Sequence, residues 1–255
     1  MNFNVSANTD VGLIRRNNQD SLLVKVVKTR QGRMAFAVLC DGMGGLAKGE
    51  LASATVIRAF DDWFMTEFQT SCEQPLVDDD ICSQWKSIVA KQNELIKQYG
   101  GRLGVRLGTT AVIMLLTQEK YYVLNVGDSR AYELHDEIRQ ITEDHSYVSR
   151  EVARGNITWE EAKTHKKRNV LLQCIGAGRT VCPDIFIGEI KPKSVFMLCS
   201  DGFWHMISSE EMYNKFNWEE VPNEKIMKCI LSDLTDLCKQ RGEKDNISIV
   251  LIKTV

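Results

Sequence analysis

The chain has 255 residues, 44% of them hydrophobic, so it can bury a sizeable core. With 32 basic against 34 acidic side chains, the net charge of −2 excludes an overall field that favours nucleic acid or an anionic membrane. The start lacks the pattern of a secretory signal, and no apolar run is long enough to span a bilayer, so we expect a cytoplasmic protein. No linker or repeat divides the chain, which predicts one domain over residues 1–255.

Short β-branched apolar runs predict strands, and longer stretches with apolar residues three and four apart predict helices. The first helix is expected to bury the face that carries Leu51, Ala54, Ile57 and Phe60. In chain order, the expected elements are strands at 22–27 and 34–40, helices at 48–68 and 84–99, strands at 110–116, 121–126 and 195–199, a helix at 224–239, and a strand at 247–252. Adjacent strand pairs and paired helices favour a mixed α/β or α+β domain with largely antiparallel sheets.

Aspartates recur at the ends of these strands. Asp41, Asp128 and Asp201 each stand beside glycine at the end of an apolar run, Asp245 precedes the last strand, and Asp20 precedes the first. A single Asp-Gly pair is usually an ordinary turn. If several such strand ends converge, however, the carboxylates repel one another unless cations neutralise them. The recurrence therefore predicts a metal site.

The ligand chemistry favours hard cations. All the candidate ligands are oxygens, without nearby His or Cys, which suits Mg²⁺ or Mn²⁺ and not a structural zinc. Two such ions can activate a shared water and screen an incoming phosphate. Arg15, five residues before Asp20, is suited to bind that phosphate, although composition alone favours a solvated surface charge at this position. A zinc site at Cys174 and Cys182 is a weaker alternative, because their spacing fits no common pattern.

Seven short motifs are spread over nearly the whole chain. They are Arg15-Arg-Asn-Asn-Gln-Asp20, Asp41-Gly-Met-Gly-Gly45, Leu107-Gly-Thr-Thr-Ala111, Gly127-Asp-Ser-Arg-Ala-Tyr132, Thr142-Glu-Asp-His-Ser146, Ser200-Asp-Gly-Phe-Trp204 and Asp245-Asn-Ile-Ser248. Together they resemble the motifs of the type 2C metal-dependent protein phosphatases, in their compact bacterial form. They occur in the family's order, which makes the resemblance specific.

The resemblance implies an α+β fold, a four-layer α-β-β-α sandwich of two mainly antiparallel sheets flanked by helix pairs. It implies hydrolysis of phosphoserine and phosphothreonine in proteins by water activated at two Mn²⁺ or Mg²⁺ ions, with a third ion in bacterial members. The expected partners are phosphorylated proteins, targets of a bacterial serine/threonine kinase, with no nucleic acid and no membrane. The chain is expected to be a monomer.

By position, the resemblance implies a role for each motif residue. Asp41 would bridge both metals, Gly42 would offer its carbonyl, Asp201 and Asp245 would complete one metal's shell, and Asp20 would act through metal-bound water. These residues form the first set of expected metal ligands.

The remaining roles concern a third ion, the substrate and a flap. Asp128 resembles the ligand of the third, weaker metal, shared with Asp201, and Arg15 would grip the substrate phosphate. Arg15, Asp41 and Asp201 are thus the expected catalytic residues. Residues 146–178 resemble a mobile flap subdomain beside the active site, with a helix cap at Thr158.

The chain departs from the family pattern at two positions. Gln19 stands where members usually carry glutamate, which lowers the negative charge near the metals and leads us to expect weaker metal binding. Met43 replaces a histidine that many eukaryotic members carry as a suggested proton donor. His145 and His205 are nearby candidates for that acid, although a structural role is the more common one for such residues.

Two other functions compete with this interpretation. Gly42-x-Gly44-x-x-Ala47 follows a strand, as in a dinucleotide-binding turn, but Asp61 lies within a helical pattern and not at the end of a second strand. The other alternative is a catalytically weak or inactive phosphatase-like domain that binds phosphoproteins. Its signature would be a missing metal ligand, and the expected aspartates are all present.

Overall fold

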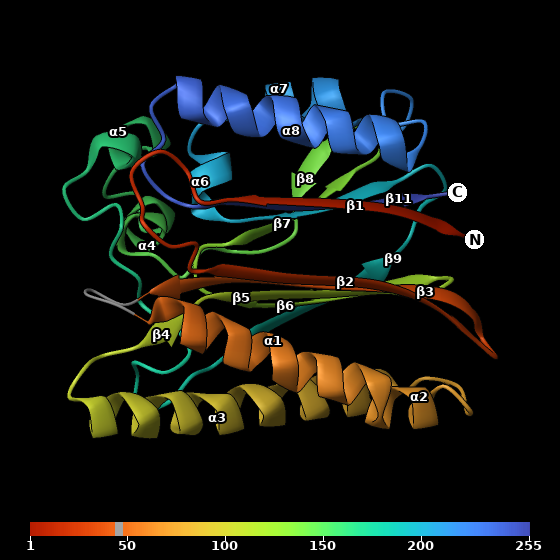
Figure 1. Ribbon diagram of the computed structural model, residues 1–255. Helices are drawn as coiled ribbons and strands as arrows, with labels where there is room; N and C mark the ends of the chain where they lie inside the picture. The colour runs from red at the N-terminus through yellow and green to blue at the C-terminus, as the bar shows by residue number, and fades with distance from the viewer. Residues whose placement is uncertain (44–47) are drawn as a thin grey trace.

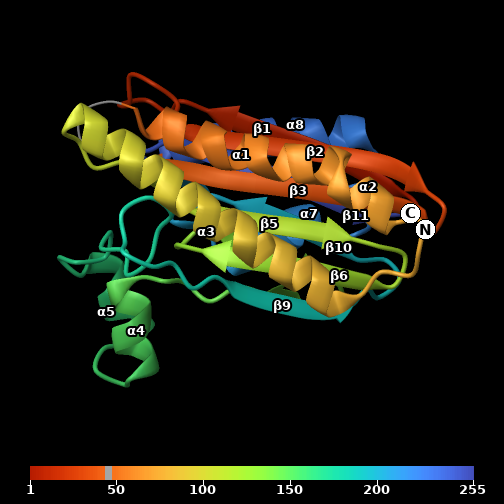
Figure 2. The ribbon, with the colours of Figure 1, turned by 90° about the horizontal axis from the view of Figure 1, so that it is seen from below.

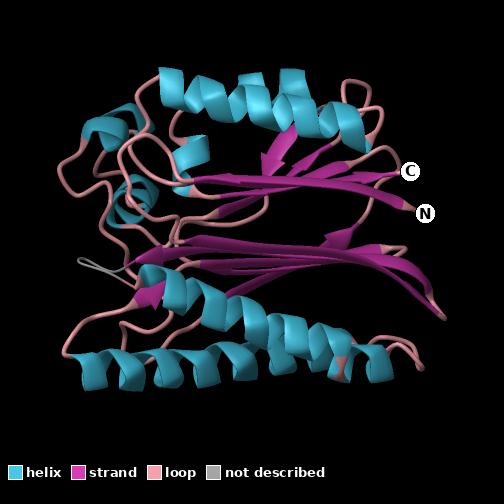
Figure 3. Cartoon of the chain, viewed as in Figure 1, coloured by secondary structure: helices cyan, strands magenta, loops and turns pink. Residues whose placement is uncertain are grey.

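The computed structural model describes residues 1–43 and 48–255. Two antiparallel sheets stack face to face, and helices cover the outer face of each sheet (Figure 1, Figure 3). This arrangement confirms the α-β-β-α sandwich that the family resemblance implied.

The first sheet has the strand order β1-β11-β10-β7-β8, with every pair antiparallel. Its strands are β1 (Phe3–Asp10), β7 (Arg130–Leu134), β8 (Ile138–Gln140), β10 (Val195–Cys199) and β11 (Ile247–Thr254).

The second sheet has the order β2-β3-β5-β6-β9, and the short β4 pairs with β3 outside this path. Its strands are β2 (Asp20–Thr29), β3 (Gly32–Met43), β4 (Gly108–Thr109), β5 (Ala111–Leu116), β6 (Lys120–Val126) and β9 (Asp184–Glu189). The antiparallel pairing of β3 with both β2 and β5 rules out the parallel sheet that a dinucleotide-binding turn requires. Gly44 to Ala47 of that turn, with Gly45 of the aspartate motif, lie outside the described residues.

Helices α1 (Gly49–Met65), α2 (Glu67–Ser71) and α3 (Asp78–Leu103) cover the second sheet, and α7 (Ser209–Phe216) and α8 (Glu224–Gln240) cover the first (Figure 1). The short α6 (Asp201–Trp204) follows β10 directly. Along β3, Phe36 packs toward the helices and Ala37 toward the opposite sheet. Because both faces are buried, this strand is apolar without interruption in the sequence.

All the predicted strands and helices occur, although the helix expected at 48–68 is divided into α1 and α2, and α3 is longer at both ends than expected. In the first half of α1 the predicted buried face was wrong: Leu51 is 39% exposed, and Ala52 and Val56 are buried instead. Further along the helix, Phe60 is buried as predicted. Sequence patterns missed β1, β7, β8, β9 and α7, which are short or only half apolar.

Residues 146–178 leave the sandwich and carry α4 (Tyr147–Ala153) and α5 (Trp159–Thr164). Figure 2 shows both helices projecting beyond one edge of the sandwich. The expected cap at Thr158 is present as a capping box, because Thr158 Oγ1 accepts the Glu161 N–H while the Glu161 side chain accepts the Thr158 N–H. Within the described ranges, no helix is both long and apolar enough to cross a membrane.

Candidate metal centre

The register of β2 against β3 brings two of the expected ligands together. Asp20 and Asp41 are direct partners across this antiparallel pair, so their side chains leave the same face of the sheet. Two like charges directly opposite each other destabilise a sheet. The pairing therefore calls for a compensating positive charge at this point.

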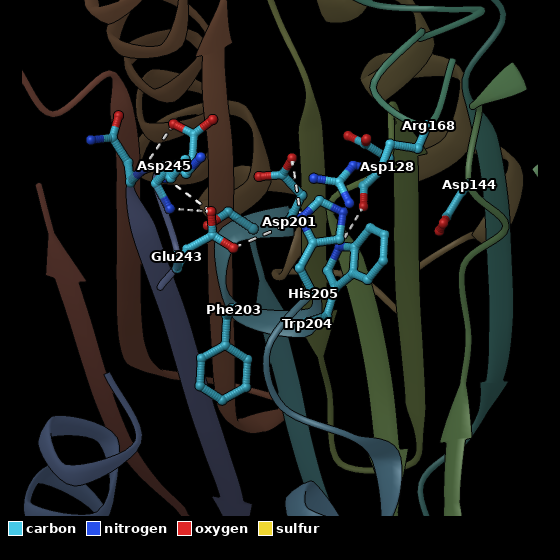
Figure 4. Close-up of polar contacts among 12 residues, drawn as sticks. Asp128, Asp144, Arg168, Asp201, Phe203, Trp204, His205, Glu243 and Asp245 are labelled. Carbon is cyan, nitrogen blue, oxygen red and sulfur yellow. Dashed lines mark hydrogen bonds and ion pairs between the residues drawn. The ribbon is translucent and has the colours of Figure 1, made fainter. Parts of the chain in front are cut away.

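The remaining carboxylates come from the other strand ends. Asp128 follows β6, Asp201 begins α6 directly after β10, and Asp245 lies just before β11. Figure 4 shows these three residues in one region of the molecule. Gly202 allows this approach, since a Cβ there would lie 2.1 Å from the carbonyl oxygen of Asn246.

The electrostatics of these side chains are those of crowded, buried anions. Burial raises the pKa of Asp20 and of Asp201 to about 7, and repulsion from other carboxylates adds to the effect. Burial also raises the pKa of Asp41 and Asp128 well above the ordinary aspartate value, with repulsion from Asp201 contributing to both. The carboxylates predicted from strand ends therefore lie close enough to interact strongly.

Several of their oxygens have no hydrogen-bond partner among residues 1–43 and 48–255. Both carboxylate oxygens of Asp20 and Oδ1 of Asp201 are buried without a hydrogen bond. Buried polar atoms are almost always satisfied, so such orphans indicate a ligand that the protein is built to receive. An all-oxygen set of carboxylates fits a hard divalent cation.

The described part of the chain nevertheless contains no group of three or more His, Cys, Asp or Glu side chains already arranged to hold a metal ion. Asp245, one of the expected ligands, is engaged with a side chain instead: its Oδ2 accepts a hydrogen bond from Arg15 Nη2 at 2.6 Å. Arg15 thus lies at the site, as expected, but it contacts one of the expected ligands directly, a contact that sequence motifs cannot reveal.

Gly42 and Gln19 lie beside Asp41, where β3 meets the start of α1. A Cβ on Gly42 would lie 2.3 Å from the carbonyl oxygen of Gly49, so only glycine lets α1 start this close to β3. The side-chain amide of Gln19 lies between the same two residues: in the amide orientation that satisfies both, its nitrogen donates to the Gly42 carbonyl at 3.3 Å and its oxygen accepts the Gly49 N–H at 3.1 Å. Gln19 therefore orients the carbonyl that was expected to bind metal.

Hydroxyl groups that sequence reasoning left without a role hold Asp41 in place. Thr110 Oγ1 accepts the Asp41 N–H at 3.0 Å, and Thr109 Oγ1 donates to the Asp41 carbonyl at 2.9 Å. Thr110 Oγ1 also lies 2.8 Å from Ser129 Oγ, which follows Asp128. This chain of contacts links the two aspartates, and the recurrence of hydroxyl residues within two of the motifs was its only sequence signal.

The two candidate histidines have different surroundings. His145 is 9% exposed, its Nδ1 accepts the Gly127 N–H at 3.2 Å, and its Nε2 lies 2.8 Å from Asp184 Oδ2. Both ring nitrogens are therefore engaged in holding the turn before Asp128. His205 instead lines a cavity, with Nδ1 4.0 Å from Asp201 Oδ2, and its role as an acid stays a prediction.

This cavity, of about 640 Å³, opens beside the carboxylates and will be called the cleft. Its lining includes Arg15, Asp201 and Asp245 as well as Trp159 and Arg168 from the 146–178 segment. The cleft therefore joins the carboxylates to the segment predicted to be a flap.

Comparison with known proteins identifies the family. Residues 15–234 match the family model described as protein phosphatase 2C. The serine/threonine phosphatase stp of Listeria innocua is 31% identical over 254 residues, covering 96% of this chain and 93% of the relative. The chain thus belongs to the protein phosphatase 2C family, which confirms the resemblance drawn from its motifs.

Comparison with solved structures supports the same family assignment. The S. agalactiae serine/threonine phosphatase superposes with a TM-score of 0.84 and 28% identity, with both chains fully covered. The catalytic domain of the serine/threonine protein phosphatase PstP, solved with 2 manganese ions, gives a TM-score of 0.79 and 28% identity, covering 99% of this chain and 98% of that one. These likenesses support catalysis over the inactive, phosphoprotein-binding alternative.

Proposed function

We propose that this phosphatase removes phosphate from phosphoserine and phosphothreonine residues of proteins, with two Mn²⁺ or Mg²⁺ ions as cofactors. The observation that carries the proposal is the set of buried, mutually repelling carboxylates whose oxygens lack protein partners. The names of the relatives support serine/threonine specificity, and the manganese-bound PstP structure supports the cofactor.

The chain's own residues divide the work of holding the ions. Asp41 and the Gly42 carbonyl, together with Asp201 and Asp245, would bind the two ions, and Asp20 would contribute through water. When bound, the ions supply an activated water and screen the charge of the phosphate. The contact between Asp20 and Asp41 across β2 and β3 fixes the spacing of the two side chains.

Asp128 and Arg15 complete the site. Asp128, buried beside Asp201, would share a third and weaker ion with it. Arg15 would bind the substrate phosphate, because its side chain is 51% exposed in the cleft and its guanidinium offers several donors at once. Binding the phosphate would draw Arg15 from Asp245 and free that carboxylate for an ion.

Residues 146–178 would act as a flap over the substrate within a single catalytic domain of residues 1–255. The segment projects from the sandwich (Figure 2), yet its α5 contributes Trp159 and Lys163 to the lining of the cleft. Its C-terminal part is held by a bridge between Ile175 and Thr109 and by the Leu172 N–H, which donates to the His145 carbonyl, and Ser146 and Leu171 bridge its two ends. A segment that is held at its base and projects from the sandwich is suited to adjust to a substrate.

The partners are phosphorylated proteins, the targets of a bacterial serine/threonine kinase, which the chain would meet in the cytoplasm as a monomer. The basic side chains Lys163 and Arg168 line the cleft and favour acidic surroundings of the phosphorylated residue. The near-neutral net charge gives no support to nucleic-acid or membrane binding.

The test is turnover of a phosphothreonine peptide with and without Mn²⁺, beside a phosphotyrosine peptide of the same sequence. We expect turnover that needs the metal and prefers phosphothreonine. A Mn²⁺-soaked crystal, with anomalous scattering, would count the ions and their ligands. Absence of turnover at millimolar Mn²⁺, or ions bound away from Asp41 and Asp201, contradicts the proposal.

A further inference from the structure

One buried carboxylate at the site belongs to none of the motifs. Glu243 lies in the loop between α8 and β11 and is 7% exposed. Its Oε1 accepts the N–H groups of Lys244 at 2.6 Å and Asp245 at 2.9 Å. Its Oε2 is buried and has no hydrogen-bond partner. The loop therefore uses one oxygen of Glu243 and leaves the other free.

The Glu243 carboxylate lies near Asp201, close enough for its charge to act on that residue. In Figure 4 the Glu243 carboxylate is directed to His205, on the side of Asp201. His205 Nδ1 lies 4.0 Å from Glu243 Oε2 and 4.0 Å from Asp201 Oδ2. Glu243 Cγ also lies 3.6 Å from the position that a Cβ on Gly202 would take. Glu243 is thus packed against Asp201 and Gly202, the first residues of α6.

No protein cation neutralises this charge. Among the residues that the structure describes, only His205 lies within ion-pair distance of Glu243. At 4.0 Å this contact is too long for a hydrogen bond, and Glu243 Oε2 has no hydrogen-bond partner among the described residues. A buried carboxylate without a cationic partner is costly, and burying one more anion beside Asp201 increases that cost.

We infer that Glu243 adds a carboxylate to the metal centre, on the side of Asp201 and Asp245, and strengthens the binding of the ion held there. The inference rests on the proposed function, since it needs a divalent cation at this point. It adds to the site a negative charge that the neutral Gln19 does not supply. A bound cation would satisfy the orphan oxygen and remove the repulsion with Asp201.

The variant Glu243→Gln isolates the charge, because an amide oxygen can still accept both loop N–H groups. Isothermal titration calorimetry with Mn²⁺ should show affinity about tenfold weaker than that of the wild type. In EDTA the same variant should melt at a higher temperature than the wild type, because an uncompensated buried charge has been removed. A residue that only stabilises the loop would not produce these opposite changes.

Glu160→Gln is the matched control, since it removes the same charge from an exposed position on the same cleft. It should change Mn²⁺ affinity by less than about twofold. Glu243→Asp, which keeps the charge, should bind Mn²⁺ more tightly than Glu243→Gln does.

Two results would overturn the inference while leaving the proposed function intact. One is wild-type Mn²⁺ affinity in Glu243→Gln. The other is equally weak binding in Glu243→Asp and Glu243→Gln, which would mean that loop geometry and not charge is needed. If the wild-type protein binds no Mn²⁺ at all, the proposed function fails together with the inference.

Discussion

Two groups of buried charges lie on the same cleft, and they are built in opposite ways. Arg130 and Asp144 form a bidentate pair, with Nη2 to Oδ2 at 2.7 Å and Nε to Oδ1 at 3.0 Å, and the guanidinium stacks on Trp204 at 3.4 Å. In the metal centre Asp245 contacts Arg15, but Asp20 and Asp201 have no arginine or lysine partner among the described residues, and both retain orphan oxygens. The first group is complete within the protein, whereas the second is complete only with a ligand.

This difference shows that a buried charge can serve either the stability of the fold or the binding of a ligand. A paired buried ion is tolerated because each charge is compensated, and breaking the pair leaves one charge exposed to an apolar surrounding. An unpaired buried anion destabilises the protein until a bound cation compensates its charge. We therefore expect mutations in the two groups to affect different properties of the protein.

The largest effect is expected for Asp41→Asn. Removing this carboxylate takes away the expected bridge between the ions, so turnover should fall by about 10³-fold or more. The fold should be retained, and the metal-free protein should be no less stable, because repulsion with Asp20 and Asp201 is relieved. Turnover of p-nitrophenyl phosphate with Mn²⁺ and a thermal melt in EDTA test both parts. Full activity in the variant would contradict the role of Asp41.

Breaking the pair between Arg130 and Asp144 should mainly lower the free energy of unfolding. Asp144→Asn leaves the Arg130 guanidinium buried with its charge uncompensated, and we expect unfolding to become easier by about 3–5 kcal/mol. Urea denaturation measures this change. If Asp144→Asn instead abolishes turnover with the free energy of unfolding unchanged, the division into a structural and a functional group is wrong.

The pH dependence of stability should also differ with and without metal. The pKa of Asp20 and of Asp201 is raised to about 7 in the folded chain, so the native state holds protons that the unfolded state releases. Without divalent metal, the free energy of unfolding should therefore fall as the pH rises from about 5 to 8. With Mn²⁺ it should rise over the same range, because ions bind the ionised carboxylates.

Melting temperatures over this pH range, in EDTA and in Mn²⁺, test the sign of each slope. Asp144→Asn in Mn²⁺ is the control. Its melting temperature should be lower than that of the wild type at every pH, but it should still rise with pH. A wild-type protein in EDTA that becomes more stable with rising pH would show that these carboxylates are satisfied within the protein.

The contrast between the two groups also explains how far the sequence could be interpreted. Asp41 and Asp201 stood out because each follows an uninterrupted apolar strand, and strand ends of one sandwich meet at one edge. Arg130 and Asp144 belong to recognised motifs, but nothing in their spacing predicts a bidentate pair. Glu243 was missed, because a carboxylate in a loop after a helix has no local signal that it is buried.

The fold was predictable to a similar extent. Both faces of β3 and β5 are buried, so their sequences are continuously apolar and were assigned correctly. The edge strands β1 and β9 mix polar and apolar residues because one side of each lacks a neighbouring strand. Their positions are set by pairing with distant strands, which local patterns do not record.

The smallest expected effect concerns Trp159, a cleft-lining residue of the 146–178 segment. Trp159 begins α5, is 53% exposed and lines the cleft. An exposed indole beside a binding site is suited to contact the chain of a protein substrate. Trp159→Ala should therefore raise KM for a phosphothreonine peptide by about five- to tenfold, a loss of about 1 kcal/mol or slightly more, with kcat nearly unchanged.

A small substrate separates this role from a structural one. Turnover of p-nitrophenyl phosphate should be unaffected by Trp159→Ala, since that molecule needs only the phosphate site. Val170→Ala is the matched control, because Val170 is also exposed and belongs to the same segment but is not part of the cleft wall. Equal losses with both substrates would mean that Trp159 stabilises the segment, and the flap would then have no separate part in recognising the phosphoprotein.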